Sequence, residues 1–329
     1  MDIQIVLILI GALFLAWTLG ANDASNCVGL AVSEKIVSYF LGVCLCSGFL
    51  ILGAFLQGSA GIETYNALSY SNNVINEFNM ALGIAFASAL CVFITNSLKL
   101  SASVSQVVVG AILGTSIVNH VFNFKPLLKI VLCWALVPII AVLISFIVYY
   151  IMFNIFKRLK VGILDHDIII KYLLIIIGCY ASYSLGANNV ANIVGVIPSS
   201  ILTDFSLTTK QVAFVAGVAI SLGVITYSKK IMLVVGKGVL KIDGFGAVVA
   251  MLSSAITLHV FAIIGVPVSS SHSIIGALLG VGLIRGGTEV KYKKISSLCI
   301  SWCVTPIMSM LISMFFYISL NSMLFIKFL

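Results

Sequence analysis

Apolar stretches alternate with short polar ones along the whole chain. They form two sets of five, at about 3–33, 36–56, 78–98, 101–119 and 127–153 and at about 172–197, 208–228, 244–265, 267–284 and 295–324. A helix needs about 20 apolar residues to cross the roughly 30 Å hydrocarbon core of a bilayer, and most of these stretches are long enough. The pattern predicts an all-α polytopic membrane protein with about 10 to 12 transmembrane segments.

The second set of segments repeats the first. The triplet GAN at 20–22 recurs at 186–188, and GAILG at 110–114 recurs as GALLG at 276–280, each 166 residues further on. Separate landmarks that keep one register indicate an internal duplication. The sequence therefore predicts two halves, each built from five segments.

The basic residues orient these halves in the membrane. With the N-terminus outside and each segment crossing once, 14 of the 18 lysines and arginines face the cytoplasm, as the positive-inside rule requires. Because five is an odd number, the second half must enter the membrane upside down, as in many secondary transporters. We expect a first inverted repeat over 1–155, a cytoplasmic connecting loop over 156–171 and a second inverted repeat over 172–329, with both termini outside.

Two features predict interrupted helices. A straight helix over 3–33 would be ~46 Å long, which exceeds the hydrocarbon core, so we expect a break at the Gly-Ala-Asn-Asp stretch, 20–23. Segments 101–119 and 267–284 open with serines, which predicts serine-rich helical hairpins built from half-helices rather than full spans. In transporters with inverted repeats, the binding site lies near the membrane midplane between the repeats.

Composition supports a membrane protein and excludes several other classes. Of the 329 residues 61% are hydrophobic and 9% are charged, whereas a soluble domain carries about 25% charged residues. The net charge of +8 comes from basic residues between the segments, so it does not indicate nucleic-acid binding. The 8 cysteines lie in apolar segments without a CxxC pair, which is typical of packing residues rather than of disulfides or a metal site.

Asp23 is the one acid of ten that this topology places inside a membrane segment. Even on a lenient insertion scale such a residue costs about 2.5–3.5 kcal/mol, so a cation, a proton or a hydrogen-bonding ligand must offset it. The alternative is an acid that shares hydrogen bonds with Asn22 and Asn26 to hold two helices together. The close copy of GANDASN (20–26) as GANNVAN (186–192) favours a binding site, because both halves then present asparagines at one depth.

The paired asparagines can serve ligands of either charge. An asparagine side chain can meet an anion through its N–H groups and a cation through its oxygen. The residues concerned are Asn22, Asn26, Asn188, Asn189 and Asn192. The glycines that open the two motifs, Gly20 and Gly186, let the backbone unwind and free carbonyl groups that can coordinate Na⁺.

The second pair of motifs is KLSASVSQVVVGAILG (99–114) and GVPVSSSHSIIGALLG (265–280). The repeat aligns Ser103 with Ser269, Ser105 with Ser271 and Gln106 with His272. Serines at these places predict N-caps beside the free N–H groups of a first helical turn, which attract anions without a basic side chain. Two such ends facing each other would hold one oxyanion from both sides. The alternative is that the serines only cap helices and the glycines allow close packing.

Together the four motifs resemble the inorganic phosphate transporter (PiT) family of cation-coupled permeases, whose signature is GANDVAN-like and then PVSTTH-like in each half. They stand here as GANDASN, GANNVAN, SASVSQ and PVSSSH, in the family's order and spread over nearly the whole chain. The resemblance implies symport of inorganic phosphate with Na⁺ or H⁺ across the plasma membrane, by a multi-pass homodimer. It implies no cofactor besides the coupling ion.

The resemblance also implies roles for individual residues. The phosphate site would include Asn22, Asp23, Ser103, Ser105, Gln106, Asn188, Asn189, Ser269, Ser270, Ser271 and His272, and the Na⁺ site would include Asp23, Asn26, Asn189 and Asn192. This chain departs from the family at Asn189, where aspartate is usual, and at Val104, where a hydroxyl is usual. Because a missing carboxylate removes a cation ligand, the coupling ion and its stoichiometry stay open.

Three alternatives to phosphate symport are open. Sulfate or another tetrahedral oxyanion fits the same fold, but near pH 7 phosphate keeps an O–H that Asp23 can accept, whereas sulfate has none. A membrane-embedded enzyme using Ser271 and His272 lacks an acid to orient the histidine, and neighbours on one helical turn point in different directions. A passive anion channel would show no concentrative uptake.

Overall fold

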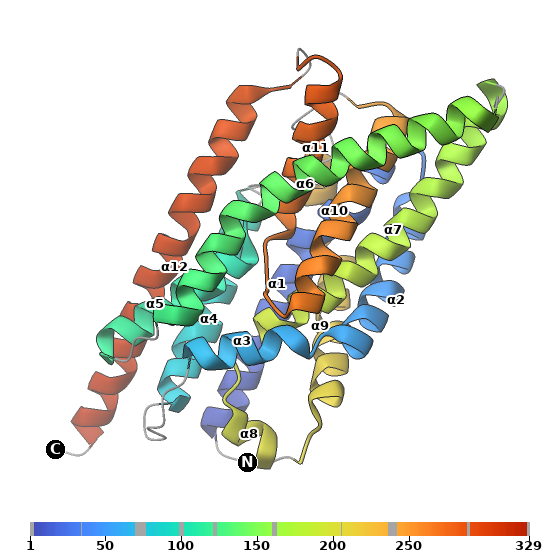
Figure 1. Cartoon of the computed structure of the whole chain (residues 1–329). Helices are drawn as coiled ribbons and strands as arrows, with labels where there is room; N and C mark the ends of the chain where they lie inside the picture. The colour runs from blue at the N-terminus through green and yellow to red at the C-terminus, as the bar shows by residue number, and fades with distance from the viewer. Residues whose placement is uncertain are drawn as a thin grey trace.

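The computed structural model describes residues 3–33, 35–69, 77–98, 102–120, 124–159, 163–204, 206–235, 242–287 and 290–327. These residues form α1 (Ile3–Ser33), α2 (Tyr39–Gln57), α3 (Ala60–Ser69), α4 (Glu77–Ser97), α5 (Val104–Val118), α6 (Phe124–Leu159), α7 (Ile163–Val194), α8 (Ser199–Asp204), α9 (Thr209–Val235), α10 (Gly244–Ile264), α11 (Ser270–Ile284) and α12 (Tyr292–Lys327) (Figure 1). Within the described residues, 8 helices are long and apolar enough to cross a membrane, and α5 and α11 are shorter apolar helices. The prediction of an all-α polytopic membrane protein is confirmed.

The first helix is continuous, so the predicted break at 20–23 is wrong. α1 runs through this stretch without interruption, and α7 does the same through the second copy of the motif. The glycines serve close helix crossings instead. A Cβ atom at Gly20 would lie 1.9 Å from the carbonyl oxygen of Ile220 on α9, and one at Gly186 would lie 2.0 Å from the carbonyl oxygen of Leu50 on α2. A helix longer than the hydrocarbon core is accommodated by tilting.

The connecting segment is largely helical, so the expected loop over 156–171 is wrong. α6 continues into this stretch and α7 begins within it, which leaves 160–162 outside the described residues. Lys157 and Arg158 fall in the last turn of α6, and Asp165 falls in the first turn of α7. Positive charge at a helix C-terminus and negative charge at an N-terminus interact favourably with the helix dipole. The charges that suggested a polar loop therefore stabilise two helix ends.

Helices of the two halves are interleaved. α1 packs against α9 and α2 against α7, and likewise α5 packs against α12 and α11 against α6. Helices that match in the duplication, such as α1 with α7 and α5 with α11, thus make equivalent contacts across the halves, as a duplicated chain predicts. The inversion of the second half, and the boundaries at 1–155 and 172–329, stay predictions.

Glycines of the GAILG and GALLG runs let the short helices approach long ones. A Cβ atom at Gly110 on α5 would lie 2.2 Å from the carbonyl oxygen of Pro306 on α12. One at Gly276 on α11 would lie 2.5 Å from the carbonyl oxygen of Pro138 on α6. Small residues allow this close approach of backbones in membrane bundles. Each half-length helix is therefore buried against a long helix of the other half.

The outward surfaces of the two longest helices are apolar. Exposed side chains on α6 include Leu132, Ile139 and Leu143, and those on α12 include Ile307 and Leu311. Exposed apolar surface of this extent is typical of a face that contacts lipid. The start of α1 and the end of α12 lie at the same end of the bundle (Figure 1). Which side of the membrane that end faces stays a prediction.

Two short helices, α3 and α8, are not expected from the hydrophobic pattern. α3 lies across the direction of the long helices (Figure 1) and packs against α7 and α10. Its sequence mixes polar and apolar residues over only 10 positions, so it resembles a loop in the hydropathy pattern. It nevertheless places Tyr65, which is 0% exposed, inside the bundle.

Candidate functional site

The candidate site lies where the signature segments of α1 and α7 meet the starts of the short helices α5 and α11. In α1 every residue from Thr18 to Ser33 is buried. All the residues that the sequence predicts for the site are at most 6% exposed, including Asp23 at 2% and Asn22 at 0%. The polar side chains therefore lie inside the protein, away from its lipid-facing surface.

Asp23 is held by one amide from each half. The Asn22 side chain donates to one carboxylate oxygen at 2.6 Å, and the Asn189 side chain donates to the other at 2.5 Å. Neither of the ion pairs formed by the described residues, His166–Asp167 and Arg285–Asp243, involves this carboxylate. Its charge thus meets neutral donors only, at the junction of the two halves.

Two further asparagine contacts tie the signature helices to the short ones. The Asn22 amide donates to the carbonyl oxygen of Ala102 at 2.9 Å, and the Asn188 amide donates to that of Val268 at 2.8 Å. Ala102 and Val268 come directly before the N-cap residues of α5 and α11, and they are 166 residues apart, like the two asparagines. The sequence repeat is therefore also a repeat of contacts.

The serines gather at the starts of α5 and α11. Ser269 is the N-cap of α11 and accepts a hydrogen bond from the backbone N–H of His272 at 3.3 Å. The hydroxyl groups of Ser270 and Ser271 accept from the Asn26 amide at 3.0 and 3.4 Å. Ser271 also donates to the carbonyl oxygen of Ala102 at 3.4 Å, which brings the beginnings of the two short helices together.

The start of α5 differs from that of α11. Ser103 is the N-cap residue of α5 but makes no side-chain capping bond. Its hydroxyl lies 3.5 Å from that of Ser105 instead. The first backbone N–H groups of α5 therefore lack the partner that Ser269 provides in α11, and helix N-termini of this kind attract anions.

His272 contacts α6 and α12 rather than the Asp23 carboxylate. His272 Nδ1 lies 3.2 Å from the carbonyl oxygen of Trp134 on α6, and its ring lies 3.9 Å from that of Trp302 on α12. Pro138 has no N–H, so the Trp134 carbonyl lacks its helical partner and is available to the imidazole. The oxygen of Gln106 has no partner among the described residues. Neither side chain has a hydrogen bond to the Asp23 cluster within the described part of the chain.

Tyr65 is a site neighbour that the sequence did not indicate. Its hydroxyl donates to the side-chain oxygen of Asn192 at 2.6 Å. Asn192 in turn donates to the oxygen of Asn189 at 3.3 Å, so Tyr65 supports the asparagine that contacts Asp23. The sequence does not predict a role for Tyr65, because Tyr65 lies on α3, which belongs to neither motif. Thr64 on the same helix donates to the carbonyl oxygen of Gly265 at 2.6 Å and fastens α3 to the end of α10.

Four side-chain amide oxygens of the first half, those of Asn22, Asn26, Asn96 and Gln106, are buried without a hydrogen-bond partner among the described residues. Two of them, Asn22 Oδ1 and Asn26 Oδ1, belong to the signature motif. No group of three or more His, Cys, Asp or Glu side chains in the described residues has the arrangement of a metal site. The ligands that the site offers to a cation are therefore amide and hydroxyl oxygens and one carboxylate, which suit a hard cation.

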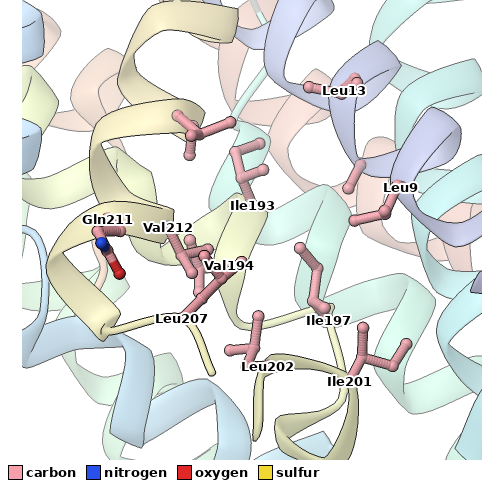
Figure 2. A pocket seen from close by; sticks show the side chains of 13 residues that line it. Leu9, Leu13, Ile193, Val194, Ile197, Ile201, Leu202, Leu207, Gln211 and Val212 are labelled. Carbon is pink, nitrogen blue, oxygen red and sulfur yellow. The ribbon is translucent and has the colours of Figure 1, made fainter. Parts of the chain in front are cut away.

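A separate cavity of about 200 Å³ lies between α1, α7, α8 and α9. Figure 2 shows side chains such as Leu9, Ile197 and Leu202 pointing into it. Among the described residues that line it, Gln211 alone is polar. An anion transferred into such surroundings would lose its hydration without gaining hydrogen bonds, so this cavity is not a phosphate site.

Comparison with known proteins agrees with this architecture. The model of a family described as the phosphate transporter family matches residues 19–313. A Methanocaldococcus jannaschii protein named as a phosphate permease is 28% identical over 312 residues, which cover 94% of this chain and 96% of the relative. A Bacillus subtilis protein named as a sulfate permease is 26% identical, with 92% and 84% covered. A solved structure described as the sodium-dependent phosphate transporter has the same fold, with a TM-score of 0.84 at 21% identity and with 97% of this chain and 99% of that chain covered.

Proposed function

Because the chain belongs to the phosphate transporter family, a family of transport proteins and not of enzymes, we propose that it carries inorganic phosphate across the plasma membrane together with a cation, Na⁺ or H⁺. The observation that carries this proposal is the buried carboxylate of Asp23, held by amides of both halves. A charge inside a membrane protein requires a compensating partner. A coupling cation supplies it, and the neighbouring helix N-termini supply a place for the anion.

Phosphate binds at the paired starts of α5 and α11 in this proposal. The hydroxyl groups of Ser103, Ser105, Ser269, Ser270 and Ser271 can donate to phosphate oxygens, and each is at most 3% exposed. The positive ends of two helix dipoles add attraction without a basic side chain. Asn22 and Asn188, which already bind the segments before these helices, set the distance between the two starts.

Sulfate is the second candidate substrate, because one relative is named as a sulfate permease. The Asp23 carboxylate favours phosphate. Near neutral pH phosphate carries at least one O–H that a carboxylate can accept, whereas sulfate offers none and is only repelled. Discrimination by a hydrogen bond that one anion makes and the other lacks is strong in a buried site.

Alternating access fits a buried site that is built from both halves. Inverted halves that rock against each other expose a central site to one side at a time. Asp23 on α1 and Asn189 on α7 meet at the boundary between the halves, so a cation bound there senses their relative position. We include in this proposal the inverted repeat, a homodimer, and termini on the outer side of the membrane.

The test is uptake of labelled phosphate into proteoliposomes that contain the purified full-length chain. Imposed gradients of Na⁺, of H⁺ and of choline as control are compared, with unlabelled sulfate, arsenate and phosphate as competitors. We expect concentrative phosphate uptake with one of the two cation gradients, competition by arsenate and phosphate, and weak competition by sulfate. Uptake that only equilibrates phosphate would show a channel, and preferred uptake of sulfate would reassign the substrate.

A further inference from the structure

All three signature asparagines of the second half use their side-chain oxygens. Asn188 Oδ1 accepts from the backbone N–H of Val268 at 3.1 Å. Asn189 Oδ1 accepts from the amides of Asn188 at 2.9 Å and of Asn192 at 3.3 Å. Asn192 Oδ1 accepts from the Tyr65 hydroxyl at 2.6 Å. Each signature amide oxygen of α7 therefore already has a donor, which makes it a weaker cation ligand than a buried oxygen without one, and this argues against the Na⁺ ligands Asn189 and Asn192 that the sequence predicts.

In the first half, by contrast, the side-chain oxygens of the signature asparagines accept no hydrogen bond from the described residues. Asn22 and Asn26 are 0% and 5% exposed, and neither oxygen has a partner among the described residues. Their nitrogen atoms are committed, Asn22 to Asp23 and Ala102 and Asn26 to Ser270, so the orientation of each amide is set and the oxygen is left over. A buried acceptor without a donor is destabilising, which makes these two oxygens the natural ligands for a positive ion.

The two free oxygens belong to residues of the same helical stretch as the carboxylate. Asn22 precedes Asp23, and Asn26 lies four residues after Asn22 on the continuous helix α1, so the two amides lie on one face a single turn apart. A carboxylate oxygen and two amide oxygens are the hard ligands that Na⁺ binds in transporters. A water molecule placed there could satisfy the amides but would leave the charge of Asp23 uncompensated.

The opposite side of the carboxylate is already filled. Asn189 stands 166 residues after Asp23, at the position that the repeat aligns with it, and its amide donates to Asp23 Oδ2 at 2.5 Å. An amide N–H presents partial positive charge to that oxygen, as a bound cation would. The side chain of Asn189 brings no negative charge that would hold a second cation.

We propose that this transporter binds one coupling cation per phosphate, between Asp23, Asn22 and Asn26, and that the Asn189 amide takes the place of a second cation. The proposal rests on the proposed cation-coupled transport and specifies its stoichiometry. It makes α1 the ion-binding copy of the motif and α7 the copy that supports it.

The test measures the ratio of labelled cation to labelled phosphate taken up by wild-type proteoliposomes, with the cation first identified by ion replacement. We expect one cation per phosphate and a non-cooperative dependence of uptake on cation concentration. In Asn189→Asp the carboxylate adds a cation ligand and removes the N–H donor, so we expect cooperative cation dependence and a ratio increased by about one. The wild-type ratio needs no variant, which keeps the proposal testable if Asn189→Asp does not fold.

A matched pair of variants tests the location. Asn26→Ala removes a free oxygen, and we expect the cation concentration for half-maximal uptake to rise ~10-fold. Asn192→Ala removes the aligned asparagine, whose oxygen is bound to Tyr65 and whose amide supports Asn189, and we expect a clearly smaller rise of this concentration, ~3-fold or less. Two cations per phosphate in the wild type, or equal shifts in the two variants, would overturn the proposal and leave symport intact. Phosphate uptake without any cation dependence would overturn symport itself.

Discussion

In α7 every side-chain oxygen of the signature asparagines accepts a hydrogen bond, whereas in α1 Asn22 and Asn26 keep oxygens that accept none from the described residues. The helices are otherwise alike. Each is continuous through its motif, and each has an asparagine that donates a hydrogen bond to the backbone just before a short helix. The difference comes from two hydrogen bonds that only the second copy receives among the described residues, one from the backbone N–H of Val268 and one from the hydroxyl of Tyr65. A duplicated motif can thus keep its scaffold while one copy becomes structural and the other keeps ligands free.

Among the described residues of the site, Asp23 is the one acid, and it belongs to the copy whose asparagine oxygens have no donor. Asp23 accepts hydrogen bonds from Asn22 of the first copy and Asn189 of the second, so the carboxylate links the two copies. The amide oxygens without a donor, those of Asn22 and Asn26, both belong to α1. Variants at positions that the repeat aligns therefore test whether the two halves differ in function or only in sequence.

The largest effect is expected from Asp23→Asn, which makes the two copies alike in charge. The variant keeps the size of the side chain and removes the negative charge that the coupling cation neutralises. We expect cation-driven phosphate uptake to fall by at least ~100-fold, about 2.7 kcal/mol or more. Asp167→Asn, at a side chain that is 88% exposed, is the control and should retain uptake. Near-normal uptake by Asp23→Asn would remove the carboxylate from the mechanism.

The next largest effect is a difference between the variants Asn22→Ala and Asn188→Ala in stability and in cation affinity. Asn188→Ala breaks three hydrogen bonds and leaves both backbone groups of Val268 without their partner, which costs about 3 kcal/mol of folding free energy. Asn22→Ala removes two donated bonds and a free oxygen, so we expect about 2 kcal/mol and a larger loss of cation affinity. The melting temperature in detergent and the cation dependence of uptake measure the two effects. The reverse ranking in either measurement would contradict the assignment of roles.

A smaller effect is expected from Tyr65→Phe. The change deletes one hydroxyl and leaves the oxygen of Asn192 without its donor, as the oxygen of Asn26 already is. We expect a loss of about 1–3 kcal/mol in stability, measured by thermal unfolding, with phosphate uptake within ~2-fold of the wild type. A variant with unchanged stability would show that Tyr65 does not support the second copy.

The smallest effect concerns the aligned serines Ser88 and Ser254. Ser254 donates to the Ser273 hydroxyl at 3.1 Å, whereas the buried Ser88 hydroxyl has no partner among the described residues. Ser254→Ala should therefore lower stability by about 1 kcal/mol, while Ser88→Ala should leave it unchanged or raise it slightly. Thermal unfolding of the two variants in one detergent decides this. Equal losses would mean that α4 and α10 do not differ in this respect.

The architecture follows from the hydrophobic pattern because lipid leaves the backbone few choices. Membrane-spanning segments without internal partners must be helical, so the apolar runs and the serine-led short segments at 101–119 and 267–284 identify their helices. The break at 20–23 was predicted wrongly because Gly20 permits both unwinding and close packing. Only the neighbouring helix α9 decides between them, and it comes from the other half of the chain.

The repeat predicts which residues form the site. It does not predict which copy keeps asparagine oxygens without a hydrogen-bond donor. Alignment at 166 residues brings Asp23, Asn189 and the serines together, and the structure places them within one buried cluster. Whether an asparagine oxygen is free depends on donors from elsewhere, such as Tyr65 on α3, which no motif includes. The polar stretch over 156–171 reads equally well as a loop or as two helix ends, because charged residues suit both.

The central claim is that Asp23 links a cation to phosphate, and linkage makes this measurable at equilibrium. Calorimetric titration of the purified wild-type protein with phosphate at increasing concentrations of the coupling cation should give a Kd that falls as the cation rises. In Asp23→Asn the Kd for phosphate should not depend on the cation. A cation-dependent Kd of the same slope in Asp23→Asn would contradict the account.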